Sequence, residues 1–216
     1  MKKIVLLQSK KHTDKIFTEE TIASLKKYGE VVINQEADEV TDENIKKIIK
    51  DADYVITSWG CPLLTNEFLK EAPNLKLLLH AAGSVKCVVS DNIWDRNIRV
   101  SSSAEAIGQG VAETALGFTI VSLKNLWNLS KFTREGEWHK GKDKIKELTN
   151  IKIGVISGGR VGQHYIKLMK NFDVEILLYD PILSEEAIAA IGAKKASFEE
   201  VLKESDLISI HAPSIE

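Results

Sequence analysis

A cluster of glycines between an apolar run and an amphipathic run is the part of this sequence best suited to chemistry. The apolar run Ile151–Ile156 predicts a buried strand, and Ser157-Gly158-Gly159-Arg160-Val161-Gly162 leads from it into a predicted helix, Val161–Asn171. A pyrophosphate group binds at such a helix start, because the first backbone N–H groups are free to donate and glycine lets the backbone approach closely. The segment therefore predicts the turn of a dinucleotide-binding β-α-β unit.

The residues of this turn have different expected roles. Gly159 stands where the backbone of the cofactor passes, and Gly162 stands where the helix packs on the strand. Ser157 occupies the first glycine position of the G-x-G-x-x-G pattern, which makes the tight turn. A serine there needs a permissive φ or a slightly different turn, and Gly158 can supply part of that freedom.

An acidic residue, Asp180, completes the pattern directly after the next predicted strand, Val174–Tyr179. A carboxylate at this place accepts hydrogen bonds from the adenosine ribose and repels a 2′-phosphate, so the sequence predicts NAD in preference to NADP. The alternative is a glycine-rich turn in an α/β domain that binds no cofactor, with Asp180-Pro181 as the start of an ordinary loop.

The other chemistry-bearing side chains give weaker signals. His80 and His211 end predicted strands, where a ring packed at the end of a sheet is a simpler interpretation than catalysis. Cys61 has no base beside it in the sequence and is not predicted as a nucleophile. Cys61 and Cys87 form no C-x-x-C pair, and we predict no metal site and no catalytic residue in this sequence.

A parallel sheet is needed to bring these residues together, and the sequence alternates β-branched runs with amphipathic runs as such a sheet requires. Helices are clearest at Thr18–Tyr28 and Asp42–Ile49, where Thr41 can serve as the N-cap. The alternation predicts an α/β fold in which the first hundred residues form one doubly wound domain with five strands. The predicted strands are Lys3–Leu7, Val31–Asn34, Tyr54–Thr57, Lys76–Ala81 and Ile98–Ser101.

The pattern changes in the middle of the chain. Gly108-Gln109-Gly110 opens a proline-free run from Val111 to about Ser130, whose apolar stripe predicts one long helix. A charged stretch at 131–147 follows as a solvated linker, and the alternation then resumes. Its later elements are a helix at Ser184–Ile191, a helix at Phe198–Glu204 with a capping box formed by Ser197 and Glu200, and a strand at Leu207–His211.

The composition excludes several classes of protein. With 29 basic and 31 acidic residues among 216, the net charge is -2, and no basic excess favours nucleic acid. The apolar start is too short for a signal peptide, and we find no stretch close to the ~20 apolar residues that a membrane span needs. Two separated cysteines are typical of a reducing compartment, so we predict a cytoplasmic protein without nucleic-acid or membrane partners.

Several short motifs occur in a fixed order along nearly the whole chain. They are Ala81-Ala82-Gly83-Ser84-Val85, Gly110-Val111-Ala112-Glu113-Thr114, Arg134-x-Gly136-x-Trp138, Tyr179-Asp180-Pro181, Glu204-Ser205-Asp206 and His211-Ala212-Pro213. In order and spacing they resemble the D-isomer-specific 2-hydroxyacid dehydrogenase family. Ser84 departs from that pattern, since a glycine is common there, and so does Lys86, where an aspartate is common.

The resemblance implies a flavodoxin-like, parallel-sheet substrate-binding domain at 1–101, followed by the first half of a Rossmann, NAD-binding domain at 102–216. It also implies NAD as the hydride carrier, a small 2-hydroxy or 2-oxo acid as substrate, and a homodimer. The loop that matches Ala82, Gly83 and Ser84 binds the substrate carboxylate through backbone N–H groups in this family. The cofactor-binding positions of the family match Val111, Gly159, Arg160, Val161, Gly162, Asp180, Ala212 and Pro213.

In the family, the catalytic Arg, Glu and His follow the His-x-Pro motif, and no residue of this sequence matches them. His211 belongs to the His-x-Pro motif itself and does not match the catalytic His. We therefore expect the N-terminal part of an NAD-dependent oxidoreductase, inactive on its own, with Leu207–His211 as an apolar edge strand. The alternative is a non-catalytic, NAD-binding regulatory protein, which Ser157 and the missing motifs favour slightly. The long helix from Val111 has apolar positions on more than one side, which predicts burial in a two-fold dimer.

Overall fold

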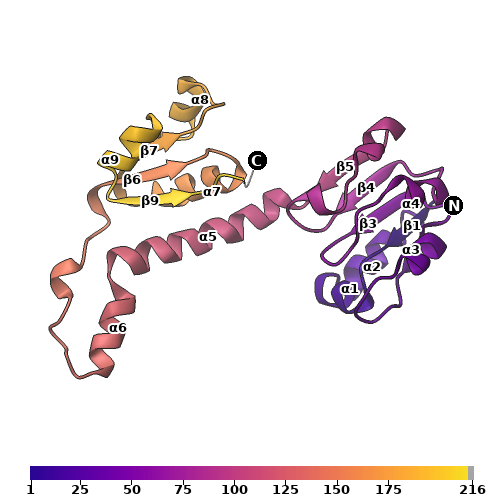
Figure 1. Ribbon diagram of the computed structural model, residues 1–216, viewed down its shortest axis with the longest axis horizontal. Coiled ribbons are helices and arrows are strands. Elements are labelled where there is room, and N and C mark those ends of the chain that lie inside the picture. Colours follow the sequence, from indigo (N-terminus) through magenta and orange to yellow (C-terminus); the bar gives the residue numbers. More distant parts are fainter. Residues whose placement is uncertain (214–216) are drawn as a thin grey trace. The chain divides into compact units, whose positions relative to one another are not determined.

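The computed structural model describes residues 1–213, which form two compact α/β units (Figure 1). The first unit is Met1–Ala104, and the second begins at Glu105. Each unit has a parallel sheet of its own, so the predicted α/β fold class is confirmed.

The first unit contains a five-stranded parallel sheet in the order β2-β1-β3-β4-β5. All its neighbouring strands run parallel, with Val5 of β1 paired to Val32 of β2 and to Val55 of β3. This doubly wound order places the carboxyl ends of all five strands at one edge of the sheet. The strands are β1 (Lys3–Leu6), β2 (Glu30–Ile33), β3 (Tyr54–Thr57), β4 (Leu77–His80) and β5 (Arg99–Ser102).

Helices cover both faces of this sheet, because alternate residues of a strand point to opposite faces. Val5 of β1 packs with Ile45 and Ile49, while its neighbours Ile4 and Leu6 pack against Phe17, Ile22 and Leu25. The N-cap predicted at Thr41 is confirmed, since its hydroxyl accepts a hydrogen bond from the Asn44 N–H. The helices of this unit are α1 (Lys10–Ile16), α2 (Glu19–Leu25), α3 (Asp42–Ile49) and α4 (Asn66–Glu71), with short 3-10 helices at Val85–Cys87 and Asp91–Arg96.

The second unit has a four-stranded parallel sheet in the order β8-β7-β6-β9. Its strands are β6 (Thr149–Ile156), β7 (Asp173–Tyr179), β8 (Lys194–Lys195) and β9 (Leu207–Ile210). Among the described strands β9 lies at an edge, as expected, and Ile210 is exposed there. The helices α7 (Arg160–Met169), α8 (Glu185–Ala190) and α9 (Phe198–Glu204) connect the strands.

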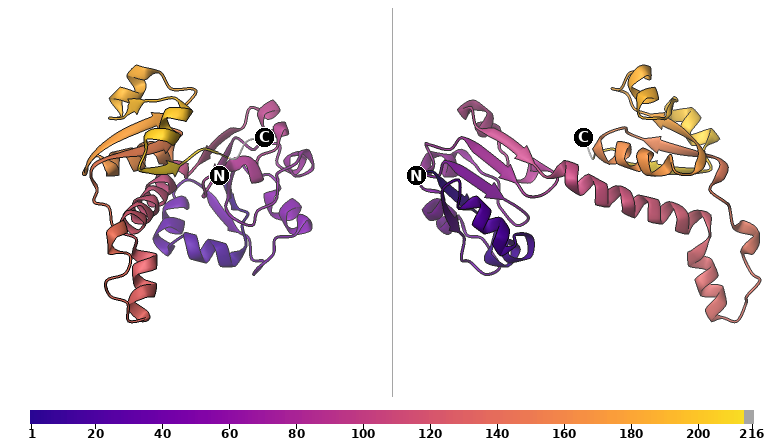
Figure 2. Two further views of the ribbon diagram at one scale, coloured as in Figure 1. Left: turned by 60° about the vertical axis from the view of Figure 1, so that its left-hand side comes forward. Right: turned by 180° about the vertical axis from the view of Figure 1, so that it is seen from behind.

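Two helices, α5 (Ala104–Leu123) and α6 (Leu126–Arg134), precede this sheet and replace the single helix expected from Val111 to about Ser130. That expectation was wrong at both ends. Gly108 and Gly110 lie inside α5 and do not open it, and Asn125 has a left-handed φ of 52°, which ends the helical path. The ribbon therefore turns sharply between α5 and α6 (Figure 2).

The helix α5 also corrects the expectation about membrane spans. Its 20 residues have a mean hydropathy of 1.3, so it meets the length and composition criteria for a span. Only 22% of the tested window is buried within the structure. Ala112, Ala115 and Leu116 of α5 pack with α7 in the core of the second unit, whereas Val111 and Phe118 of the same helix are exposed.

Candidate functional site

The glycine turn joins β6 to α7 and has the backbone that a dinucleotide site requires. Ser157 has a φ of 77°, so a serine adopts the left-handed conformation that glycine usually supplies. Its N–H donates to the Tyr179 carbonyl at 2.9 Å, which ties the turn to the end of β7. Gly159 is the N-cap of α7, and no side chain among the described residues caps this helix start. The first N–H groups of α7 are therefore free to bind an anion.

The space around each glycine of the turn shows which of them is required for close packing. A Cβ on Gly162 would lie 2.1 Å from the backbone oxygen of Ser157, and a Cβ on Gly158 would lie 2.7 Å from Leu183 Cδ1. A Cβ on Gly159 would meet only Ser157 Oγ, at 3.7 Å. Gly162 is thus needed for close packing of helix and strand, whereas Gly159 borders open space at the helix start. The close packing at Gly162 is as expected, and the cofactor-binding role of Gly159 stays a prediction.

Asp180 is buried at the end of β7 and is bonded to two loops. Its Oδ2 accepts from the Gly158 N–H at 2.8 Å, and its Oδ1 accepts from the N–H groups of Ile182 and Leu183 at 2.9 and 3.1 Å. Burial alone would raise the pKa of Asp180, but these three hydrogen bonds and the charge of Lys195 outweigh it and hold the pKa below its usual range. The carboxylate is therefore ionised at neutral pH and connects the glycine turn to the loop after β7.

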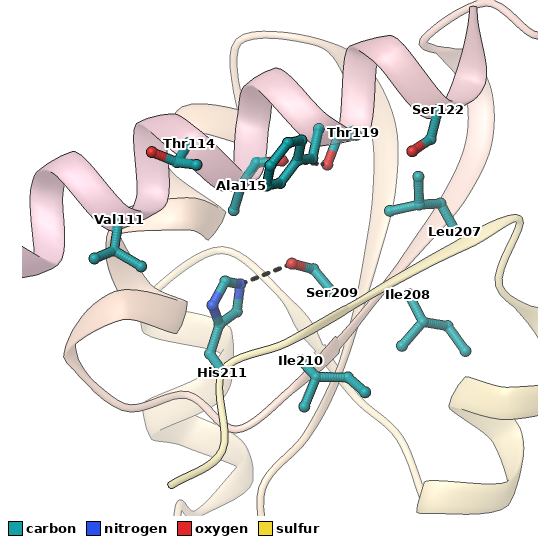
Figure 3. Close-up of a pocket in the computed structure, with 11 residues that line it drawn as sticks. Val111, Thr114, Ala115, Thr119, Ser122, Leu207, Ile208, Ser209, Ile210 and His211 are labelled. Carbon is teal, nitrogen blue, oxygen red and sulfur yellow. Dashed lines mark hydrogen bonds between the residues drawn. The ribbon is translucent and has the colours of Figure 1, made fainter. Parts of the chain in front are cut away.

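The other cofactor-binding candidates lie within α5, at the start of α7 and after β9. Arg160 is exposed, and its Nε lies 3.5 Å from Glu105 Oε2. Val111 and His211 border one groove of about 550 Å³ between α5 and β9, which Figure 3 shows. Ala212 and Pro213 follow His211 directly and are exposed.

A polar network beside this groove was not found by sequence reasoning. The Tyr165 hydroxyl lies 2.7 Å from Thr119 Oγ1, and the Tyr165 and His211 rings pack in a tilted arrangement with centroids 5.1 Å apart. His211 Nε2 contacts Ser209 Oγ at 2.9 Å, as Figure 3 shows, and burial lowers the pKa of this histidine. The only signal in the sequence is a tyrosine on the apolar face of a helix, which does not distinguish a network from simple packing.

The predicted substrate loop follows β4 in the first unit. Ala82 is buried and its carbonyl accepts from the Ser103 N–H at 3.0 Å, while the Ser84 hydroxyl accepts from the Lys86 N–H at 3.4 Å. A Cβ on Gly83 would meet nothing within 4 Å. No hydrogen bond within residues 1–213 uses the backbone N–H of Gly83 or Ser84. The two groups are available to an anionic ligand.

The histidines and cysteines in the described part of the chain are mostly engaged elsewhere. His80 is buried with its Nδ1 2.9 Å from Thr57 Oγ1, and burial lowers its pKa. His164 Nε2 lies 2.9 Å from Glu105 Oε1, the one histidine–carboxylate contact within residues 1–213. Burial raises the pKa of the Cys61 thiol to about 11, which argues against a nucleophile. No metal-binding cluster occurs among the described residues.

Comparison with known proteins gives consistent matches. Residues 116–216 match the sequence model described as D-isomer specific 2-hydroxyacid dehydrogenase, NAD binding domain. The chain is 29% identical over 196 residues to a D-3-phosphoglycerate dehydrogenase of Methanocaldococcus jannaschii, covering 90% of this chain and 37% of that protein. It is 27% identical over 196 residues to a hydroxypyruvate reductase of Thermotoga maritima, covering 88% of this chain and 63% of that protein. The chain thus spans less than two thirds of either relative.

Two solved structures agree in fold. A phosphoglycerate oxidoreductase from Rhizobium etli has a TM-score of 0.78 at 24% identity, covering 100% of this chain and 66% of that one. An NAD-dependent formate dehydrogenase from Staphylococcus aureus, in complex with NAD, has a TM-score of 0.64 at 26% identity, covering 100% and 65%.

The parallel sheet, the uncapped glycine turn and the buried Asp180 define a dinucleotide-binding protein of the Rossmann type. Residues 116–216, within the second unit, match the NAD-binding domain of the D-isomer-specific 2-hydroxyacid dehydrogenase family, and the two relatives support the same family for the chain. The family resemblance of the motifs and the expected nicotinamide cofactor are thereby confirmed.

Proposed function

We propose that this chain binds the cofactor and the substrate of an NAD-dependent oxidoreductase that acts on a 2-hydroxy or 2-oxo acid. The observation that carries the proposal is the free start of α7, with Gly159 open beside it and Asp180 fixed next to it. Bound NAD would supply the hydride chemistry, by transfer between its nicotinamide and C2 of the substrate.

The residues of the chain have the following roles in this proposal. The N–H groups at the start of α7 bind the pyrophosphate, and Asp180 accepts hydrogen bonds from the adenosine ribose. The free N–H groups of Gly83 and Ser84 bind the substrate carboxylate. The ionised Asp180 opposes a 2′-phosphate, so NAD is preferred over NADP.

We also propose that the described residues bind these ligands without completing proton transfer. A general acid must reach the substrate oxygen, and His12, His80 and His211 instead contact hydroxyl groups. His164 contacts a carboxylate but lies on the flank of α7. A non-catalytic, NAD-binding regulatory protein is the second candidate, favoured by the engagement of these four histidines with hydroxyl groups or a carboxylate.

Substitution at Gly159 tests the cofactor site. Gly159→Ala should fold, because its Cβ meets only one atom at 3.7 Å, but it should weaken NADH binding about tenfold by occupying the phosphate approach. Gly117→Ala is the control, since its Cβ would meet nothing within 4 Å and it lies away from the proposed cofactor positions. Fluorescence titration with NADH measures both variants. Equal affinity of Gly159→Ala and the unsubstituted chain would contradict the proposed site.

An assay of NADH oxidation with a panel of 2-oxo acids separates the two candidate functions. Binding of NADH without turnover on any acid supports the binding role proposed for the described residues. Clear turnover that depends on one acid would show that a proton donor has been overlooked, with His164 the first residue to substitute.

The proposed assembly is a homodimer in the cytoplasm. Phe118, Leu126 and Trp127 expose apolar surface along α5 and α6, and a second copy would cover it. The thiol groups of Cys61 and Cys87 are free, which favours a reducing compartment. Cell fractionation and light scattering test these two points.

A further inference from the structure

A second pocket, of about 570 Å³, lies over the carboxyl ends of β7 and β8 and includes Asp180 in its wall. Ligands of parallel α/β sheets bind outside the carboxyl ends of the strands, so this pocket adjoins the expected ribose position. Tyr179 ends β7, and Ala196 and Ser197 follow β8 directly, so the pocket extends from Asp180 away from β6.

The charges in this pocket are unequal. Asp180, Glu185 and Glu200 contribute carboxylates, and Lys195 is the only cation among its described lining residues. Glu200 is already engaged, because its Oε2 accepts from the Ser197 N–H at 2.7 Å in the confirmed capping box. An anionic ligand that enters the pocket would therefore meet the carboxylates of Asp180 and Glu185 and the ammonium group of Lys195.

Lys195 is held next to Asp180 through a shared residue. Its Nζ donates to the Leu183 carbonyl at 3.1 Å, and the Leu183 N–H donates to Asp180 Oδ1 at 3.1 Å. The Lys195 ammonium group and the Asp180 carboxylate thus both bond to the backbone of Leu183, although Lys195 and Asp180 are far apart in sequence. The sequence shows no basic residue directly after Asp180, so only the fold brings this cation to the ribose position.

We propose that this pocket receives the 2′ position of the adenosine ribose and that Lys195 determines how strongly the site discriminates against a 2′-phosphate. The inference rests on the proposed cofactor site. Asp180 repels the phosphate, and Lys195 offsets part of that repulsion by a charge-assisted hydrogen bond to the phosphate oxygens. Selectivity for NAD is therefore partial while Lys195 is present and increases when it is removed.

Two lysine variants test this role. Lys195→Met should weaken NADPH binding about tenfold and change NADH binding less than twofold, as expected for one lost charge-assisted hydrogen bond. Lys194→Met is the matched control, because Lys194 is the other residue of β8 and pairs with Glu175 at 3.7 Å instead of facing Asp180. The control should leave both affinities unchanged. Dissociation constants are measured by titration with NADH and NADPH, without substrate.

The possible results separate the inference from the proposed function. Equal weakening of NADH and NADPH in Lys195→Met would show that Lys195 only holds the loop at Leu183, and unchanged affinities would show that the pocket does not receive the 2′ position. Either result overturns the inference while leaving the cofactor site intact. Failure of the unsubstituted chain to bind either cofactor would overturn the proposed function and the inference with it. Lys195→Arg, which keeps the charge, should retain most of the NADPH affinity.

Discussion

Ser157 has a backbone conformation that its own side chain disfavours. A residue with a Cβ pays about 1 kcal/mol in the left-handed region, and Ser157 lies there with a φ of 77°. We expect Ser157→Gly to stabilise the second unit by up to about 1 kcal/mol, with a Tm increase of a few degrees in thermal unfolding.

A serine in an ordinary strand is the control for this change. Ser101 lies in β5, and its hydroxyl forms no hydrogen bond within residues 1–213, so Ser101→Gly should lower stability by adding flexibility to the unfolded chain. If Ser157→Gly unfolds at the same temperature as the unsubstituted chain or below it, the turn gains nothing from the glycine and the conformational argument is wrong.

The ionisation of Asp180 predicts how the second unit responds to acid. Because the folded pKa lies below the unfolded value, the unfolded carboxylate binds protons more readily. Its contribution to stability is therefore complete above about pH 4, the usual range of an aspartate, and is lost as the pH falls through the folded pKa. We expect Asp180→Asn to lower the free energy of unfolding at pH 7. The variant should also lose less of that free energy than the unsubstituted chain when the pH falls from 7 into the acidic range.

Urea unfolding at a series of pH values measures this effect. Asp38 gives a control, because its carboxylate also has a lowered pKa from its hydrogen bond to Lys11, but it is exposed. Asp38→Asn should change stability little at any pH. If the free energy of unfolding changes with pH in the same way for Asp180→Asn and for the unsubstituted chain, the charge of Asp180 contributes nothing to stability.

At the scale of helices and strands, local signals predicted some elements closely and missed others for identifiable reasons. The helix predicted at Asp42–Ile49 and the capping box at Ser197 were found as predicted, because capping depends on neighbouring residues. The helix Lys10–Ile16 and the strand Lys194–Lys195 were missed, since both are polar and carry no apolar period. The break at Asn125 was missed because one left-handed residue leaves the apolar stripe of the sequence unchanged.

The apolar side chains that α5 and α6 expose lead to a prediction about assembly. Phe118 and Trp127 are both more than half exposed, and their rings are tilted toward each other with centroids 6.2 Å apart, so they form one aromatic patch across the break between the helices. We expect the double variant Phe118→Glu and Trp127→Glu to be monomeric by light scattering at concentrations where the unsubstituted chain is dimeric.

Trp94→Glu is the control for this experiment, because Trp94 is similarly exposed but lies in the first unit. It should leave the dimer intact. A membrane is the other surface that α5 could contact, since the length and hydropathy of this helix fit a membrane span. A vesicle co-sedimentation assay tests this alternative. Binding of the chain to vesicles, with loss of binding in the double variant, would contradict the dimer.

At the scale of the whole molecule, the two units have separate cores and should unfold separately. One core is built on β1, β3 and β4, and the other on β6, β7 and α7. We expect two transitions in calorimetry, and NADH should raise only the second unit's Tm, because a ligand stabilises the part that binds it. At a concentration 100 times the dissociation constant the gain is about 2.7 kcal/mol. A single transition, or an equal shift of both, would contradict this division.

The candidate site illustrates how far sequence reasoning reaches at this scale. The glycine turn and Asp180 were predicted because one β-α-β unit contains them all, within a short stretch of chain. Three pairs of neighbours could not be predicted, because each contact joins elements that only the packed sheet brings together. They are Lys195 with Asp180, Glu105 with His164, and Thr119 with Tyr165.

The three N–H groups that hold Asp180 have a kinetic consequence. Both oxygens of this carboxylate are fixed by Gly158, Ile182 and Leu183 before any ligand arrives. Binding of the adenosine half then requires no ordering of this loop, so its entropic cost is small. Association should occur in one fast step whose rate grows linearly with cofactor concentration, without the plateau that a slow loop closure produces.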